Sequence, residues 1–530
     1  MRLPKTDKTN HSLLCVLTTL LATLGLNAQS VQRSPLVLGI IVEGLQDDYL
    51  RLLEPQLSEG GFKRLMNKGL SINSIDFGPG LDPTAAAAVI YTGAAPMVNG
   101  IPAEQIYTPA TNLTTKVLVD PKCIGNFTDE TFSAKAIKVS TLADEFRIDT
   151  EGDGMVYAIG ADPQMALVAA GHAANGAYWI YDHTGNWAST TYYKEMPASV
   201  SNRNYLTPLH SRLDTIKWTP SRPLDSYPLI SRGERNRPFR HTYPSKQFDR
   251  FTRFKNTPPG NTEVTDLALD LMSTAKMGRD ENPDMLNIVY TLSLPGATRL
   301  ETIDAYLRLD RDLARLFSTA DRVSSAGAPT IFLAGTPSRG GMSPDDPKWR
   351  VPTGEYSIKK AMSLLEMYLM ATHGNGDWVT GYNNRQFFLN RKYITDRGLS
   401  LSDFRTEVAD FLARMAGVSN VFTIDDIIAA RVGDDPQALK RNISVEHCGD
   451  VIVEVNPGWV IVDDNNPNPN SRRPAERNNA ASIPAFIMGP NVSATKIETP
   501  VDARAIAPTV AHTIRIRAPN ASSVPPVRTN

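Results

Sequence analysis

Short apolar runs separated by amphipathic segments dominate the chain. The first run, residues 36–42, is continuous (Leu-Val-Leu-Gly-Ile-Ile-Val) and ends at Glu43. A run without polar alternation is typical of a strand that is buried on both faces, as in a parallel sheet. Similar runs, each of which predicts a strand, recur at residues 155–159, 286–292, 330–334, 451–455 and 483–488.

Helical periodicity fills the intervals between these runs, most clearly at residues 302–317 and 401–416. Strands that alternate with helices predict an α/β fold, with a mostly parallel central sheet and helices on both faces. Sites in such sheets are built at the carboxyl ends of the strands. Glu43, which follows the first strand, is therefore a candidate functional residue.

Several stretches interrupt the alternation. Residues 196–262 are polar, basic and Pro-rich without sustained periodicity, which predicts an insertion. A smaller α+β insertion is expected at about residues 341–445, and residues 463–482 have the Asn- and Pro-rich composition of a loop. We find no internal repeat, and we expect a single α/β domain over residues 29–530 that carries these insertions.

The N-terminus has the pattern of a secretory signal peptide, residues 1–28. Basic residues precede an apolar run at 13–26, and the sequence Leu-Asn-Ala predicts cleavage after Ala28. A retained anchor is the alternative, but roughly 14 apolar residues are fewer than the ~20 that span a bilayer. No later segment is long and apolar enough to span. We therefore expect a periplasmic or secreted protein.

Composition and charge narrow the classes of function. The chain has 530 residues, of which 41% are hydrophobic and 21% charged, which fits a folded protein and excludes disorder, collagen and coiled coil. The net charge is −1, so no global field attracts nucleic acid, and a nucleic-acid partner is not expected. After signal cleavage Cys123 and Cys448 remain, either as one disulfide or as free thiols.

The most informative segment is residues 80–93, Gly-Leu-Asp-Pro-Thr-Ala-Ala-Ala-Ala-Val-Ile-Tyr-Thr-Gly. Pro followed by Thr and an Ala-rich run predicts a turn that leads into a helix. The hydroxyl of Thr84 would then lie near unpaired backbone N–H groups, a place that suits an anion or a phosphorylated hydroxyl. The alternative interpretation is an ordinary helix cap.

With its other motifs, the chain resembles the alkaline phosphatase superfamily, close to the periplasmic monoesterases with a Thr nucleophile and their phosphodiesterase/nucleotide pyrophosphatase relatives. The similarity runs from about residue 35 to 525. Its motifs include residues 60–65, 90–93, 170–174, 306–313, 449–451 and 506–509. The resemblance implies the superfamily fold and a reaction in which two Zn²⁺ ions, held by three Asp and three His, activate the hydroxyl nucleophile.

The positions that the resemblance assigns to these zinc ligands hold other residues. Glu43 stands where the family has Asp, and an expected Asp-x-x-x-His falls on residues 294–298, which contain neither Asp nor His. An expected Asp-His dipeptide falls on Thr336 and Pro337, and the last His falls near Arg473. At most Glu43 remains, as a vestigial metal-ligand position.

No shift of the alignment restores the imidazoles. The chain has no His between residues 242 and 372, and after residue 373 it has only His447 and His512, outside the loop in question. We therefore expect no metal cofactor. An isolated carboxylate in a closed pocket is costly, so Arg473 would pair with Glu43 if both side chains point into the site. The alternative is that Arg473 lies on a solvent-facing loop.

The positions that the resemblance assigns to substrate binding also hold other residues. A Lys-x-Arg pair that would bind phosphate is replaced by residues 162–164, Asp-Pro-Gln, and a phosphate-binding Asn corresponds to Glu104. These changes exchange attraction of an anion for repulsion. Thr84 keeps the residue type of the nucleophile, but its segment is one residue shorter than the usual pattern. We expect Thr84 to be a vestigial catalytic position and no substrate-binding residue to remain.

Other clusters are weaker candidates. His172 and His183 near Asp182 would form a small metal or acid/base site, or else are structural. The remaining clusters either bind a partner or are solvated faces, loops and helix caps: Asp47 with Asp48, Asp425 with Asp426, and Arg472, Arg473 and Arg477.

The sequence thus predicts an exported, catalytically degenerate alkaline-phosphatase-like protein that binds or scaffolds in the cell envelope. Its partner would be an unknown envelope protein or a small ligand. Two alternatives stay open at this point. One is an active phosphomonoesterase or phosphodiesterase with an atypical zinc site, and the other is a structural subunit of an envelope complex.

Overall fold

The structure is a computed structural model. It describes residues 33–529 except 295, 325–326, 339–353, 432, 435, 457–458, 463, 465–472 and 475–481. The predicted signal peptide lies outside the described residues. Residues 34–530 form one compact unit.

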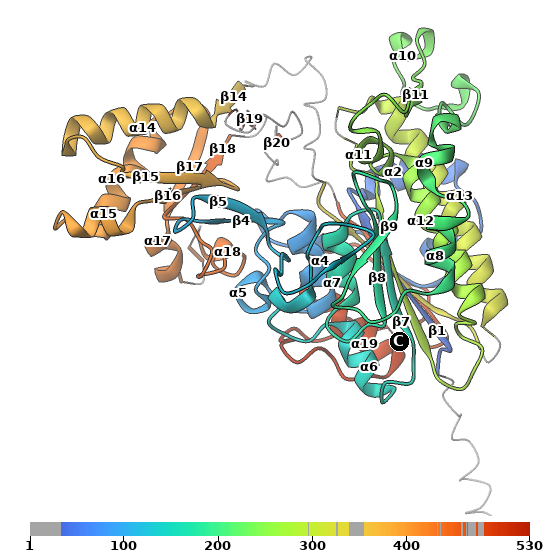
Figure 1. Cartoon of the computed structure of the whole chain (residues 1–530). Helices are drawn as coiled ribbons and strands as arrows, with labels where there is room; N and C mark the ends of the chain where they lie inside the picture. The colour runs from blue at the N-terminus through green and yellow to red at the C-terminus, as the bar shows by residue number, and fades with distance from the viewer. Residues whose placement is uncertain are drawn as a thin grey trace, which may run out of the picture. The chain divides into compact units, whose positions relative to one another are not determined.

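A ten-stranded sheet forms the centre of this unit (Figure 1). Its strand order is β22 (Thr495–Ile497), β2 (Leu70–Ile72), β21, β13, β1, β12, β7, β8, β9 and β6 (Gly125–Asn126). Its middle strands, which are mutually parallel, are β13 (Thr330–Thr336), β1 (Leu36–Glu43), β12 (Asp284–Thr291), β7 (Val156–Gly160) and β8 (Gly176–Ile180). The flanking strands β21 (Ala485–Met488) and β9 (Trp187–Thr190) run antiparallel to β13 and β8. The predicted mostly parallel sheet is confirmed.

Strand β1 is paired on both sides, and all eight of its residues are buried. Its side chains alternate between two cores: Leu38 and Ile40 pack in one, and Val37 and Ile41 in the other. Because both faces are covered, neither face needs polar residues, which explains the continuous apolar run.

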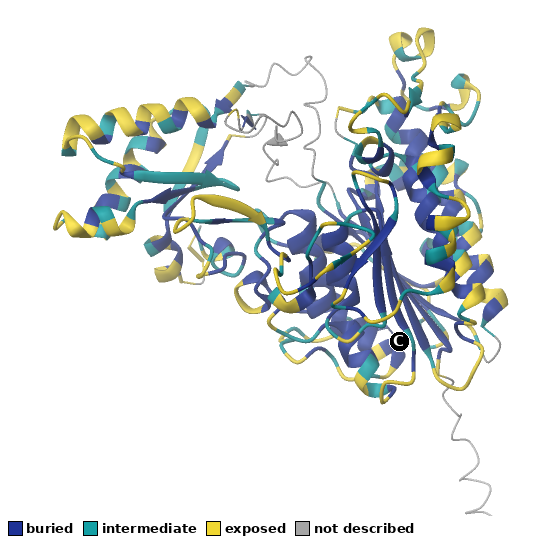
Figure 2. Cartoon of the chain, in the orientation of Figure 1, coloured by how far each residue is buried: buried dark blue, intermediate teal, exposed yellow. Residues whose placement is uncertain are grey.

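Helices cover both faces of the sheet, and the buried residues gather between the layers (Figure 2). One core contains residues of α2 (Asp47–Leu53), α3 (Phe62–Lys68), α12 (Pro258–Thr274) and α13 (Arg299–Val323). The other contains residues of α4 (Pro83–Thr92), α6 (Leu142–Asp149), α7 (Pro163–Ala170) and α19 (Ile506–Ile514). The helix predicted at residues 302–317 is the middle of α13.

Two predicted elements lie outside the central sheet. Residues 451–455 do form a strand, β18 (Val451–Val455), but it belongs to a separate antiparallel sheet. The order of that sheet is β15 (Val379–Asn383), β16 (Gln386–Leu389), β18 and β17 (Val418–Thr423). The helix predicted at 401–416 is α16 (Leu401–Ala413), which packs in the same hydrophobic core as β18. Strand β18 buries side chains on both of its faces, so its sequence has the same continuous apolar run as a central parallel strand.

The basic stretch 196–262 contains short elements and the start of a core helix. The helices are α8 (Ala198–Tyr205), α9 (Leu209–Arg212), α10 (Arg232–Asn236) and α11 (Arg250–Lys255), and strands β10 (Lys217–Trp218) and β11 (His241–Thr242) form a two-stranded sheet. Helix α12 begins at Pro258, so the last residues of the predicted insertion belong to the core.

A buried carboxylate anchors this insertion to α13. The side chain of Asp304 accepts hydrogen bonds from Trp218 Nε1, Ser221 N and Tyr227 Oη, each at 2.7 Å. Its fourth donor, Arg308 Nε, is also 2.7 Å away. Asp304 is fully buried, so each donor depends on a charge that no water can replace.

We predict that Asp304→Asn lowers the free energy of unfolding by about 3 kcal/mol, because the amide brings its own N–H₂ group among four donors and leaves the Arg308 charge without its partner. Urea denaturation followed by fluorescence measures the change. Asp225→Asn is the matched control: the Asp225 side chain is 97% exposed, and its loss should change the stability by less than about 0.5 kcal/mol. Equal effects of the two variants would contradict the anchoring role.

Candidate functional site

Three parallel strands end side by side at the predicted site. Glu43, the last residue of β1, is the register partner of Thr291 in β12 and of Thr336 in β13. Gly44 follows with φ of +77°, and its N–H donates to the Thr336 carbonyl at 3.0 Å. A Cβ atom at Gly44 would lie 3.2 Å from the backbone nitrogen of Ser293, so glycine suits this turn. Glu43 is buried, with 3% exposure.

Several neutral polar side chains lie at the same strand ends as Glu43. The hydroxyl oxygens of Ser293 and Ser338 lie 2.7 Å apart. Asn261, from α12, donates to the Thr291 carbonyl at 2.7 Å and accepts from the Thr291 N–H at 3.0 Å, so its amide is committed to the backbone. Hydroxyl groups and amides of this kind are not the thiolate, imidazole and carboxylate ligands that hold Zn²⁺.

The histidines hold positions elsewhere. His172, His241 and His373 pair with Asp144, Glu301 and Glu407, and the ring of His183 contacts Tyr181 and Phe248. His210, His447 and His512 are also described, which accounts for every histidine after residue 28. Among the described residues, no group of three or more His, Cys, Asp or Glu side chains could hold a metal ion.

Thr84 lies in the first turn of α4, as predicted. The N-cap of this helix is Asp82, whose Oδ1 accepts from the Ala85 N–H at 2.9 Å, while its Oδ2 accepts from the Glu104 N–H. The Asp82 carboxylate therefore brings a negative charge to the helix end that would otherwise attract a phosphate. Thr84 is fully buried, and its Oγ1 has no hydrogen-bond partner among the described residues.

The residues that replace the expected phosphate clamp have structural contacts. Gln164 is fully buried, donates from Nε2 to the Glu104 carbonyl at 2.9 Å, and accepts from the Leu118 N–H at 3.3 Å. Asp162 caps α7 by accepting from the Gln164 N–H at 2.9 Å. Neither position supplies a cation, and Glu104, whose backbone joins this network, is itself a buried acidic residue.

The weaker clusters from the sequence do not assemble into sites. Asp182 pairs with Lys255 at 2.7 Å, whereas His172 binds Asp144, so the combined site of His172, His183 and Asp182 is not formed. Asp47 pairs with Arg51 in the first turn of α2.

The other acidic pair also has structural partners. Asp425 lies 3.0 Å from Arg405, and Asp426 caps α17 (Ile424–Ala429) through a capping box with Thr423. Arg472, Arg477 and the side chain of Arg473 lie outside the described residues, so the Glu43–Arg473 contact stays a prediction.

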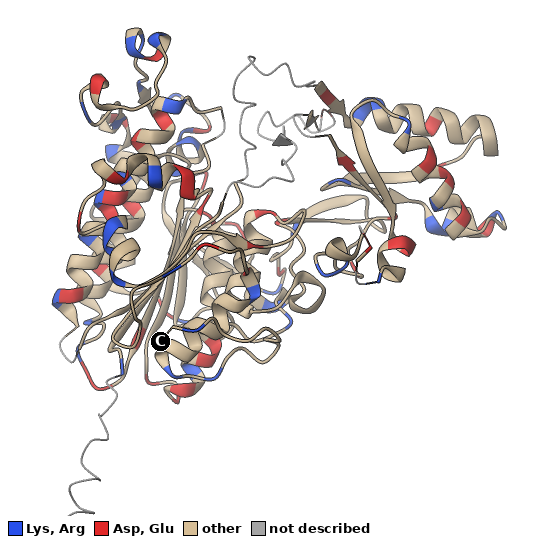
Figure 3. Cartoon of the chain, turned by 180° about the vertical axis from the view of Figure 1, so that it is seen from behind, with Lys and Arg blue, Asp and Glu red and all other residues tan. Residues whose placement is uncertain are grey.

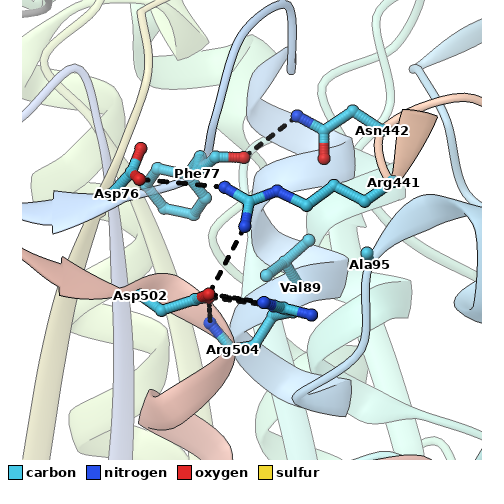
Figure 4. A pocket seen from close by; sticks show the side chains of 8 residues that line it. All are labelled: Asp76, Phe77, Val89, Ala95, Arg441, Asn442, Asp502 and Arg504. Atoms are coloured by element: carbon cyan, nitrogen blue, oxygen red, sulfur yellow. Dashed lines mark hydrogen bonds and ion pairs between the residues drawn. The ribbon is translucent and has the colours of Figure 1, made fainter. Parts of the chain in front are cut away.

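A shallow pocket lies beside α4 (Figure 4). Asn442 Nδ2 donates to the carbonyls of Phe77 and Pro79 at 3.0 and 2.8 Å, which holds the loop that leads into α4. The residues that line the pocket are Asp76, Phe77, Val89, Ala95, Arg441, Asn442, Asp502 and Arg504.

The charges of this pocket are balanced. Arg441 faces Asp502 and Asp76 at 3.4 and 3.7 Å, and Arg504 pairs with Asp502 at 2.6 Å. The two guanidinium groups are matched by two carboxylates, so the lining of this pocket has no excess positive charge for a phosphate. Cys123 and Cys448 are buried free thiols, so they do not form the disulfide that was one of the two possibilities. Among the described residues, no helix is both long and apolar enough to cross a bilayer.

His172 is the centre of a structural contact. Its Nδ1 lies 2.8 Å from Asp144 Oδ2 and its Nε2 lies 2.9 Å from the Ile137 carbonyl, so both ring nitrogens face acceptors. Both can donate only if the ring is protonated. The hydrogen bond to Asp144 raises the pKa of His172 against the opposing effect of burial. Asp144 also accepts from the backbone N–H groups of His172 and Ala173.

We predict that the stability contributed by His172 is fully present below about pH 6.5, the ordinary pKa of the unfolded group, and is lost as the pH rises through the raised folded pKa. Urea unfolding between pH 5.5 and 9 should show wild type to be more stable than His172→Gln by about 1–2 kcal/mol at the acid end. The difference should shrink with rising pH. A difference that is independent of pH would contradict the charged contact.

Comparison with known proteins identifies the family to which the chain belongs. The family of type I phosphodiesterases and nucleotide pyrophosphatases matches residues 37–480, and the chain belongs to this family. This confirms the resemblance drawn from the motifs.

The chain is similar over nearly its full length to characterised relatives. It is 26% identical to alkaline phosphatase PhoV of Synechococcus elongatus, covering 93% of this chain and 92% of that protein. It is also 26% identical to alkaline phosphatase PafA of Elizabethkingia meningoseptica, with 94% of each chain covered. The crystal structure of wild-type PafA has the same fold, with a TM-score of 0.81, 24% identity, and coverage of 94% of this chain and 99% of that one.

Proposed function

We propose that this protein is a catalytically degenerate member of its family, which retains the fold, has lost the metal site, and acts by binding or scaffolding in the cell envelope. The observation that carries the proposal is the placement of the histidines. Every histidine after residue 28 is described, and among the described residues none joins a group of three or more ligand side chains that could hold a metal ion. Two Zn²⁺ ions need about four ligands each.

The donor set at the strand ends does not fit a two-zinc centre. Glu43 is a carboxylate, but its register partners Thr291 and Thr336 are neutral, and Asn261 is bound to the backbone. Without a metal ion, no described group is placed to activate the Thr84 hydroxyl or to neutralise a phosphoryl oxygen.

The second support is the charge around Thr84. Asp82 places a carboxylate at the N-terminus of α4, and Glu104 and Asp162 stand where the family resemblance expects phosphate-binding groups. Loss of the metal and of the cationic clamp removes several kcal/mol of transition-state stabilisation, and each ~1.4 kcal/mol is tenfold in rate.

A second candidate function is a working phosphoester hydrolase with an atypical site. One observation favours it: Thr84 is retained at the start of α4, and its buried Oγ1 makes no hydrogen bond within the described part of the chain. A buried hydroxyl without a partner costs free energy, so its retention is expected where it has a chemical role. The names of the relatives, alkaline phosphatases, support the same candidate.

We predict that the purified chain, assayed with added Zn²⁺, hydrolyses neither p-nitrophenyl phosphate nor bis-p-nitrophenyl phosphate above the blank, and that Thr84→Val changes nothing. Alkaline phosphatase PafA serves as the positive control. Thr92→Val is the matched control for folding, because Thr92 lies on the same helix and its Oγ1 donates to the Ala88 carbonyl at 2.6 Å. Turnover by wild type that Thr84→Val abolishes and Thr92→Val retains would establish the hydrolase instead.

A further inference from the structure

The insertion at residues 196–262 carries a local charge that the net charge of −1 conceals. It holds twelve Lys and Arg against four Asp and Glu. The densest part is residues 232–240, where Arg232, Arg235, Arg237 and Arg240 fall within nine positions. Helix α10 begins this segment and strand β11 follows it, at the end of the insertion that lies away from the central sheet (Figure 1).

The nearby acidic side chains are committed to other contacts. Glu234 accepts from the Ser231 N–H at 2.7 Å and from the Leu300 N–H at 2.9 Å, so its carboxylate caps α10 and holds it against the start of α13. Asp225 pairs with Arg235 at 2.8 Å. The remaining arginines are therefore not neutralised by their own segment.

Arg232, Arg237 and Arg240 are exposed and form no ion pair within the described ranges. Lys217, on the β10 strand that pairs with β11, is exposed as well. We call these four residues the α10 basic surface, and basic segments mark this end of the molecule in Figure 3. Leu229, 66% exposed, lies just before α10 and adds an apolar side chain to the same end.

We propose that the α10 basic surface docks on an anionic phospholipid bilayer. Guanidinium groups bind phosphate oxygens in a bidentate manner, and each basic residue near an anionic membrane surface adds to the binding free energy. The α10 basic surface is carried by short helices and strands and does not line a groove, which suits a flat partner such as a bilayer. The exposed Leu229 side chain can enter the headgroup region. The surface lies outside the strand-end site, so the inference goes beyond the proposed function.

Vesicle sedimentation of the full purified chain tests the proposal. Wild type should bind vesicles of equal parts phosphatidylcholine and phosphatidylglycerol at low salt, should be released at high salt, and should not bind phosphatidylcholine alone. The triple variant Arg232→Glu, Arg237→Glu, Arg240→Glu should lose about a hundredfold in affinity, since each cation contributes about fivefold. The corresponding Gln variant should show a smaller loss, and circular dichroism checks that both remain folded.

The matched control is Arg311→Glu, Arg414→Glu, Arg517→Glu. These three arginines are also exposed and make no ion pair among the described residues, and the substitutions change the net charge by the same amount. The control should bind within about threefold of wild type. The proposal is overturned if wild type does not bind the anionic vesicles, if the control loses as much as the α10 variant, or if the chain is retained only by double-stranded DNA or an acidic protein. Phosphoester hydrolysis is read separately, so neither result depends on the other.

Discussion

The pairing of β1 with both β12 and β13 is the constraint on which the rest of the molecule depends. It places a fully buried strand at the middle of the sheet and brings Glu43, Thr291 and Thr336 to one edge. The close packing requires glycine at position 39, where a Cβ atom would lie 2.2 Å from Asn287 Oδ1 and 2.7 Å from the Phe332 ring. The two cores, and the helices that close them, are built outward from this strand.

The same frame positions the protein groups that hold the ends of these strands. Here the register partners of Glu43 are threonines, and Asn261 ties the end of β12 to α12 through two hydrogen bonds. Protein groups thus hold the strand ends in place. Near Thr84, Asp82 caps α4, Asp162 caps α7, and Gln164 donates a hydrogen bond to the Glu104 carbonyl.

Much of the central sheet and the start of α4 could be predicted from the sequence, because these elements depend on local sequence patterns. The apolar runs predicted β1, β12 and β13, and the Pro-Thr-Ala pattern predicted the start of α4. The central-sheet position expected for residues 451–455 was wrong, because burial on both faces gives the same run in either kind of sheet. The partner of His172 could not be predicted either: Asp144 lies 28 positions away, and only the packing of α6 against α7 brings them together.

The central claim is that the family's metal centre has been lost, and metal content tests it most directly. The purified chain is dialysed against Zn²⁺, freed of unbound metal, and measured by elemental analysis beside alkaline phosphatase PafA. The account predicts no stoichiometric zinc in this chain, because the described residues contain no group of three or more His, Cys, Asp or Glu side chains that could hold a metal ion. Two zinc ions bound per chain, removed by Glu43→Ala, would contradict it.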